Sequence, residues 1–289
     1  MDRKLVDRFF RDRFEGFTSS EIGVLLYFPF DEKKSPLLIN SDIDENLINK
    51  VQFYNRTTQY LHLIEEQEPL KLTQRGNLPR KFCRELCDLG FLDDLRDSKF
   101  YKRHPLMSEE DSPCIHIINI ITQLCGFTRK KHGKLFLTRK CKTYLYKKSA
   151  SEIYKYIFIS YAKKFNWAYD DYGSESWIMQ AGFSIFLVQK YGDKLRKIKF
   201  YVDKFEHAFP SVMFDFHDTR HSNAEEEFRI YYYMRTFKDF LKRFGLIEIG
   251  NERDYYSGTQ NIKKTVLLDQ LIKWKKSGSF KYVFKSQNI

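Results

Sequence analysis

Apolar residues along the first half of the chain alternate between helical and strand-like spacing. Residues 42–66 place Leu47, Val51, Tyr54 and Leu61 on one face, which is helical periodicity. Residues 70–73 then predict a short strand, and a helix follows that begins near Pro79 and ends at Gly90. The apolar run 114–125 predicts another helix. The predicted order is therefore helix, strand, helix, helix.

A β-hairpin is predicted directly after this last helix. Two short runs, 126–131 and 134–138, flank the dipeptide His132-Gly133. A two-residue hairpin turn requires positive φ, which glycine adopts readily. We therefore expect a tight hairpin whose turn is His132-Gly133.

The same succession of residue classes returns in residues 237–275. In both stretches an apolar helix ends at a glycine, Gly126 or Gly245, and a short strand follows. Each second strand ends at a threonine, Thr138 or Thr265, and runs into another helix. Glycine fits the left-handed position that closes a helix. The pattern predicts an internal structural repeat.

Other segments predict helices at 149–165, 177–191, 196–209 and 222–244. Thr18-x-x-Glu21, Ser149-x-x-Glu152 and Ser222-x-x-Glu225 are capping-box patterns that mark helix starts. The charged stretch 93–111 is interpreted as a mobile insertion. Residues 166–176, rich in Gly, Ser and acidic side chains, are interpreted as a linker.

The order of elements over residues 42–148 resembles a winged-helix domain, and the stretch LKLTQRGNLPRKF resembles the helix–strand–helix corner of winged-helix modules in bacterial proteins. Two such domains in a basic chain are also similar to plasmid replication initiators. The resemblance implies an α+β, mostly helical fold with two winged-helix-like domains, each carrying a small β-hairpin wing. We expect an extension at 1–40 that prefaces the first domain, a first domain at 41–165 and a second at 177–289.

Charge is concentrated around the predicted hairpin. The net charge of the chain is +12, but residues 1–126 carry 18 Lys and Arg against 21 Asp and Glu. Residues 127–149 contain nine Lys or Arg and no acidic residue. This asymmetry favours a polyanionic partner. The alternative is a solvated edge hairpin whose lysines only prevent aggregation.

The long helix 222–244 is the second predicted contact surface. Its apolar face is predicted to hold Ile230, Met234, Phe237, Leu241 and Phe244, with cations, Tyr231 and Tyr232 on the opposite face. The alternative is an ordinary solvated helix surface. The helix at 114–125 offers no cation, only His116, Asn119, Thr122 and Gln123, which counts against base reading by the first domain. The predicted nucleic-acid contacts are Arg129, Lys130, Lys131, Lys134, Arg139, Lys140, Arg235, Lys238, Lys242, Arg243, Lys263 and Lys264.

Motifs for catalysis are weak. His217 and His221 are spaced for a shared metal if their segment is helical, but Asp218 stands where zinc hydrolases need Glu. We interpret the segment as a polar loop. The five cysteines are expected to be reduced thiols, although Cys83 and Cys87 are one helical turn apart and leave a metal alternative. No cofactor is expected.

The expectation from sequence is a cytoplasmic, non-enzymatic protein that binds double-stranded DNA, without a secretory signal or a membrane-spanning run. It would serve as a regulator or as an accessory of replication or of a mobile element. The first alternative is a protein-interaction module that binds an acidic partner, and homodimerisation also stays open. A minor alternative is a metal-dependent hydrolase.

Overall fold

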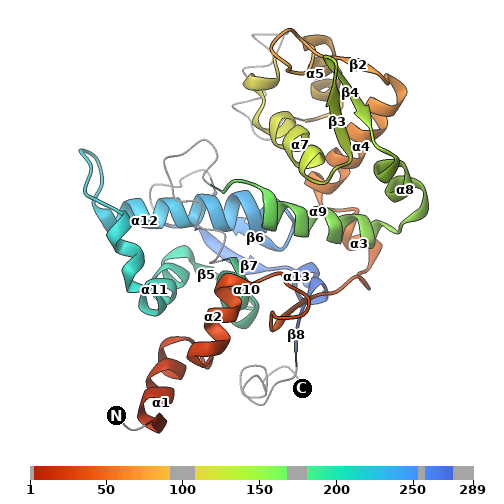
Figure 1. Cartoon of the computed structure of the whole chain (residues 1–289). Helices are drawn as coiled ribbons and strands as arrows, with labels where there is room; N and C mark the ends of the chain where they lie inside the picture. Colours follow the sequence, from red (N-terminus) through yellow and green to blue (C-terminus); the bar gives the residue numbers. More distant parts are fainter. Residues whose placement is uncertain (1–2, 92–107, 168–180, 253–257, 276–289) are drawn as a thin grey trace. The chain divides into compact units, whose positions relative to one another are not determined.

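The computed structural model describes residues 3–91, 108–167, 181–252 and 258–275, and the chain divides into two compact units. Unit 1 comprises residues 1–47 together with 166–289, and unit 2 comprises residues 48–165. The fold is α+β and mostly helical. The described residues form three small antiparallel sheets (Figure 1).

Unit 2 follows the predicted order of helix, strand, helix, helix and hairpin. Its elements are α4 (Gln52–Glu66), β2 (Leu70–Lys71), α5 (Arg80–Asp88), the short helix η1 (Glu109–Asp111), α7 (Pro113–Leu124), β3 (Thr128–Lys131), β4 (Lys134–Leu137), α8 (Arg139–Lys147) and α9 (Ala150–Lys164). In Figure 1 the strands β2, β4 and β3 lie beside one another, with α4, α5 and α7 packed around them.

The core of unit 2 forms where the apolar faces of these helices meet the sheet. Tyr60 of α4 packs edge-on against Phe82 of α5, with ring centroids 5.9 Å apart. Ile115 and Ile118 of α7 and Leu135 of β4 are fully buried. The predicted short strand and hairpin are confirmed because their apolar residues close this core.

Unit 1 contains both ends of the described chain. Its elements are α1 (Arg3–Arg13), α2 (Ser19–Tyr27), β1 (Leu37–Ile39), α3 (Glu45–Ile48, whose last residue belongs to unit 2), α10 (Ala181–Tyr191), β5 (Arg196–Lys197), α11 (Ile198–Ala208), the 3-10 helix η3 (Pro210–Asp215), α12 (Ala224–Tyr232), the π-helix η4 (Tyr233–Lys242), β6 (Ile247–Gly250), β7 (Asn261–Lys264), α13 (Val266–Leu271) and β8 (Ile272–Trp274). Its core is aromatic, with Phe183, Phe205, Tyr232 and Phe237 fully buried or nearly so.

The predicted repeat is present in the backbone. Strand order is β2-β4-β3 in unit 2 and β5-β7-β6 in unit 1. Gly126 and Gly245 both have φ of 68°, and each follows the last turn of a helix. The hydroxyl of Thr138 donates to the carbonyl of Gly126 at 2.7 Å, and that of Thr265 donates to Gly245 at 2.8 Å. The glycine and threonine therefore form the same closing contact in both units.

The N-terminal segment belongs to unit 1 rather than to the unit that contains the predicted first domain. Strand β1 pairs antiparallel with β8, with Leu38 opposite Lys273, and α2 packs against α10. Phe17 lies edge-on to Phe186 at 4.6 Å. Residues 1–47 therefore complete unit 1, which corrects the expected preface at 1–40. The pairing joins segments more than 230 positions apart, and no local pattern reveals it.

The long helix of unit 1 also departs from its predicted form. It starts one residue late, because Asn223 rather than Ser222 forms the capping box, with Glu226. From Tyr233 to Lys242 it is a π-helix. A wider turn shifts every later side chain relative to a 100° wheel. Tyr232, predicted on the basic face, is fully buried at the last position of α12, directly before the π-helix begins.

Two predicted segments fall largely outside the described residues, namely most of the insertion 93–111 and most of the linker 166–176. The described end of the insertion is ordered and contains the buried Glu109, which is a correction to the mobile segment expected there. Within the described ranges, none of the helices has the length and apolar character needed to cross a membrane.

Candidate nucleic-acid interface

The hairpin of unit 2 presents its cations on a short, regular ribbon. Strands β3 and β4 pair from Thr128 opposite Leu137 to Lys131 opposite Lys134. The turn residues His132 and Gly133 have φ of 50° and 68°. Two successive positive values match the twist of a two-residue hairpin turn, so the predicted tight turn is confirmed.

Three lysines lie side by side across this sheet. Lys131 of β3 is in register with Lys134 of β4, and Lys134 is in register with Lys71 of β2. Directly opposed residues of antiparallel strands project from the same face, with strands about 4.8 Å apart. All three side chains are exposed. We call Lys71, Lys134 and Lys131 the lysine row.

The lysine row has no acidic neighbour in the part of the chain that the structure describes. No carboxylate there lies within 4.0 Å of Lys71, Lys131 or Lys134. Arg129, two residues before Lys131 on the same face of β3, is exposed and also lacks a carboxylate at that distance. These four cations form a positive surface that no ion pair with a described carboxylate compensates.

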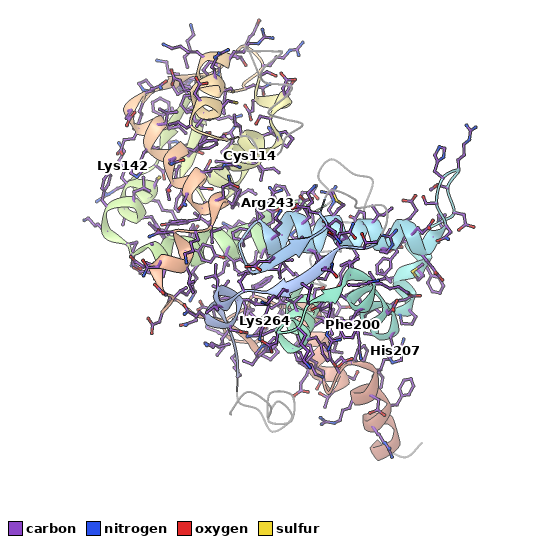
Figure 2. All side chains as sticks on the ribbon, turned by 180° about the vertical axis from the view of Figure 1, so that it is seen from behind. Cys114, Lys142, Phe200, His207, Arg243 and Lys264 are labelled. Carbon is purple, nitrogen blue, oxygen red and sulfur yellow. The ribbon has the colours of Figure 1, made fainter. Side chains whose placement is uncertain are left out.

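Other predicted cations of unit 2 already have partners. Lys130 donates to the carbonyl of Gly76 at 2.8 Å. Lys140 donates to the carbonyl of Cys125 at 3.1 Å and lies 4.1 Å from the ring centroid of Tyr156. Lys142 of α8, labelled in Figure 2 and not among the predicted contacts, also has a partner, because it pairs with Glu68 at 3.1 Å. These contacts anchor local structure, although each side chain stays exposed. Arg139 is exposed without such a carboxylate.

The helix before the hairpin buries two of its polar side chains. Asn119 and Thr122 of α7 are buried, and Asn119 accepts a hydrogen bond from the Tyr60 hydroxyl at 3.0 Å. Helix α9 packs against α7 within the same unit. Of the polar residues named from the sequence, Asn119 and Thr122 therefore serve the interior, whereas His116 and Gln123 are partly exposed. Helix α7 carries no cation.

The second hairpin does not repeat the positive surface. The positions equivalent to Lys131, Lys134 and Lys71 are Gly250, Asn261 and Lys197, by the same register of strands. Lys263 is exposed but lies opposite Glu248.

Lys264, one of the predicted nucleic-acid contacts, is buried and lies between two carboxylates. Its side chain is 5% exposed and its ammonium group lies 2.9 Å from carboxylates of both Asp193 and Asp269. It also donates to the carbonyl of Gln189 at 3.2 Å. Burial alone lowers the pKa of Lys264, but these two carboxylates raise it above its usual value. Figure 2 shows Lys264 against the strands of unit 1.

The predicted basic face of the long helix is also compensated. Arg243 lies 3.1 Å from Asp239, and Arg235 lies 3.8 Å from the same carboxylate. The side chains of Arg235 and Arg243 are only 13% and 16% exposed. Lys242 pairs with Glu252, and Lys238 is half-buried. The structure therefore pairs Arg235, Lys242 and Arg243 with carboxylates, and the helical periodicity of the sequence did not predict these pairs.

The His217–His221 segment does not have the helical geometry that the metal alternative requires. It is an exposed loop in which the backbone N–H of Ala224 donates to Asp218, and it is not helical, so the i, i+4 spacing does not align the imidazoles. Among the described residues no group of three or more His, Cys, Asp or Glu is placed to hold a metal ion.

The sequence patterns did not predict that Lys71 belongs to this positive surface. It sits in a two-residue strand some 60 positions before the hairpin, and only the pairing of β2 with β4 brings it beside Lys134. The available signal was the exposed position of Lys71 between the buried Leu70 and Leu72.

Comparison with known proteins yields one match. A family model described as the Y4jL N-terminal domain matches residues 49–151. The matched stretch lies within unit 2 and includes the whole lysine row. No curated protein and no solved structure matches the chain.

Proposed function

We propose that the protein is a non-enzymatic double-stranded-DNA-binding protein built on two winged-helix-like repeats, and that the lysine row of unit 2 grips the phosphate backbone. The order helix, strand, helix, helix, hairpin supports the winged-helix assignment in both units. The strand orders β2-β4-β3 and β5-β7-β6, with the hairpin at one edge, support it further. The hairpin of unit 2 would act as the wing.

The lysine row is the observation that carries this proposal. Like charges directly opposite each other on a sheet are destabilising. Two ammonium groups about 6 Å apart in water repel by roughly 0.7 kcal/mol. The row contains two such neighbouring pairs, Lys71–Lys134 and Lys134–Lys131, with no compensating carboxylate among the described residues. A phosphate backbone supplies the missing negative charge over the same length.

Binding of this kind reads the backbone rather than base edges. The helix in the usual recognition position, α7, carries no cation, buries Asn119 and Thr122, and packs against α9. Contacts to phosphates position a protein on DNA but carry little sequence information. We therefore expect affinity that depends steeply on salt and weakly on base sequence.

Two other interpretations use the same surface. An acidic protein would satisfy the lysine row as a phosphate backbone does. Alternatively, the lysines only protect the edge strand β3 from pairing with other chains. The three interpretations differ in what the row binds, so they can be separated by competition.

The test measures duplex affinity for a variant that lacks two cations of the lysine row. A matched variant that lacks two cations of the other repeat serves as the control. Lys131→Gln/Lys134→Gln is expected to weaken binding to a 20-base-pair duplex by at least tenfold in fluorescence anisotropy at low salt. Lys197→Gln/Lys263→Gln removes the same charge from exposed positions on the sheet of unit 1 and is expected to change affinity by less than threefold.

Each rival interpretation has its own outcome. Equal losses in the two double variants would show that net charge, rather than the row, determines binding. Retention of polyglutamate but not of duplex by the unmodified protein would favour the acidic partner. If the unmodified protein bound neither the duplex nor polyglutamate, the remaining interpretation would be that the lysines protect the edge strand from pairing with other chains.

A further inference from the structure

An apolar hollow lies at the end of the lysine row. It occupies about 360 Å³ beside β2, within unit 2. Leu70, Leu72 and Phe82, all buried side chains, form its floor, together with Pro79. This size is at the lower end of small-ligand pockets. The hollow is distinct from the lysine row in chemistry but adjoins it.

The rim of the hollow is positive. Lys71 and Lys81 both line it, and both are exposed. Neither has a carboxylate within 4.0 Å among the described residues. Lys71 is also the outermost member of the lysine row, so one side chain borders both features. A polyanionic ligand bound along the lysine row therefore extends to the hollow, and its negative charge lies next to the hollow's rim.

We infer that this hollow receives one unpaired nucleobase whose flanking phosphates lie on Lys71 and Lys81. This inference rests on the proposed DNA binding. A nucleobase is flat and largely apolar on its faces, and each is attached to a backbone that carries a negative charge per nucleotide. The hollow and its rim combine the same two properties: an apolar floor and adjacent cations.

A paired base does not satisfy the site, because its faces are covered within the stack and must be extruded at a cost. The natural ligand is therefore a duplex with an adjoining single-stranded stretch, held by the lysine row through its backbone and by the hollow through its first unpaired base. Among nucleic acids, this predicts a preference for junctions and ends over continuous duplex.

The experiment varies the ligand and leaves the protein intact. Fluorescence anisotropy is measured with three DNAs of identical duplex: one blunt, one with a four-nucleotide thymidine overhang, and one whose overhang is abasic. The abasic overhang keeps the phosphates and removes the bases. We expect the thymidine overhang to bind about fivefold tighter than the abasic one, the lower end for stacking of one base.

A crosslink places the base. An overhang containing 5-iododeoxyuridine is irradiated with the full chain, and digestion is followed by mass spectrometry. Attachment to the peptide that contains Leu70–Leu72 or Phe82 supports the inference. Attachment elsewhere, or equal affinity for the thymidine and abasic overhangs, overturns it.

The outcomes separate the two proposals. Equal, salt-dependent binding of all three DNAs leaves backbone binding intact and removes only the hollow. Failure of all three DNAs to bind removes both. If the protein bound an acidic, phenylalanine-containing peptide and none of the DNAs displaced that peptide, the hollow and its rim would instead be assigned to a protein partner.

Discussion

At the scale of single residues, the buried carboxylate of Glu109 holds together the corner of unit 2 next to the hairpin. It accepts hydrogen bonds from the backbone N–H of Leu78 and from Asn119, both at 2.7 Å, and contacts His116 at 3.0 Å. Its side chain is 3% exposed. Burial by itself raises the pKa of Glu109, but the hydrogen bonds from His116, Leu78 and Asn119 together lower it below the usual 4.5.

We predict that Glu109→Gln lowers the free energy of unfolding by about 2 kcal/mol near neutral pH, the scale for hydrogen bonds to a charged group. The folded-state pKa of Glu109 lies below its unfolded value, so its stabilisation is present above pH 4.5 and is lost as the pH falls through the folded pKa. The difference between variant and unmodified protein in urea unfolding should therefore shrink at acidic pH.

The exposed neighbour Glu110 supplies the control for this prediction. Glu110→Gln should change stability by less than about 0.5 kcal/mol, as expected of a surface substitution. A pH-independent effect of Glu109→Gln would contradict the assigned role of the carboxylate.

The cysteines give a second prediction at this scale. All five are free and buried. Burial raises the pKa of Cys83 to about 12, that of Cys125 to about 11 and that of Cys141 to about 12. Thiols rather than thiolates prevail near neutral pH, and thiols react slowly. We expect a thiol reagent to modify none of these three cysteines in the folded protein and all five after unfolding. Rapid labelling of Cys83 in the folded protein would be inconsistent with this.

At the scale of elements, the hairpin turn determines the register of the lysine row. Gly133 has φ of 68°, which costs an L-residue with a side chain roughly 1–2 kcal/mol. Gly133→Ala should lower stability by about that amount. His132→Asn should stabilise the turn, because Asn-Gly is preferred there. Thermal unfolding of the two variants should therefore shift in opposite directions. Shifts in the same direction would contradict the turn geometry.

The lysine row predicts a trade between stability and binding. Lys134 stands between Lys71 and Lys131, so Lys134→Gln relieves both repulsions. We expect it to raise stability by up to about 1 kcal/mol and to weaken duplex binding. Urea unfolding and anisotropy on the same preparation measure both effects. A gain in stability without loss of affinity would support the solubility role instead.

Local chemistry made some elements predictable. The glycine that ends a helix and the threonine that ends the second strand predicted both hairpins, because they act through contacts within 20 residues. Long-range pairing was not predictable, as with β1 and β8. The π-helix was also missed, since a change in helical pitch leaves no mark on composition, and so was the burial of Tyr232 directly before it. Of the candidate surface, the sequence identified Arg129, Lys131 and Lys134 but not Lys71.

At the scale of the whole molecule, the two repeats share a backbone plan and differ in charge. Unit 2 carries the lysine row, while the equivalent positions of unit 1 hold Gly250, Asn261 and Lys197. Unit 1 pairs its buried Lys264 with Asp193 and Asp269 and its helix arginines with Asp239. The proposed phosphate contact therefore belongs to unit 2.

The most direct measurement is the salt dependence of duplex affinity for the unmodified protein and for Lys131→Gln/Lys134→Gln. Each neutralised phosphate contributes a slope of about −0.9 to the plot of log affinity against log salt. The account predicts that the double substitution makes the slope less negative by about 1.8, whereas Lys197→Gln/Lys263→Gln leaves it unchanged. Identical slopes for all three proteins would contradict the claim that the lysine row holds a phosphate backbone.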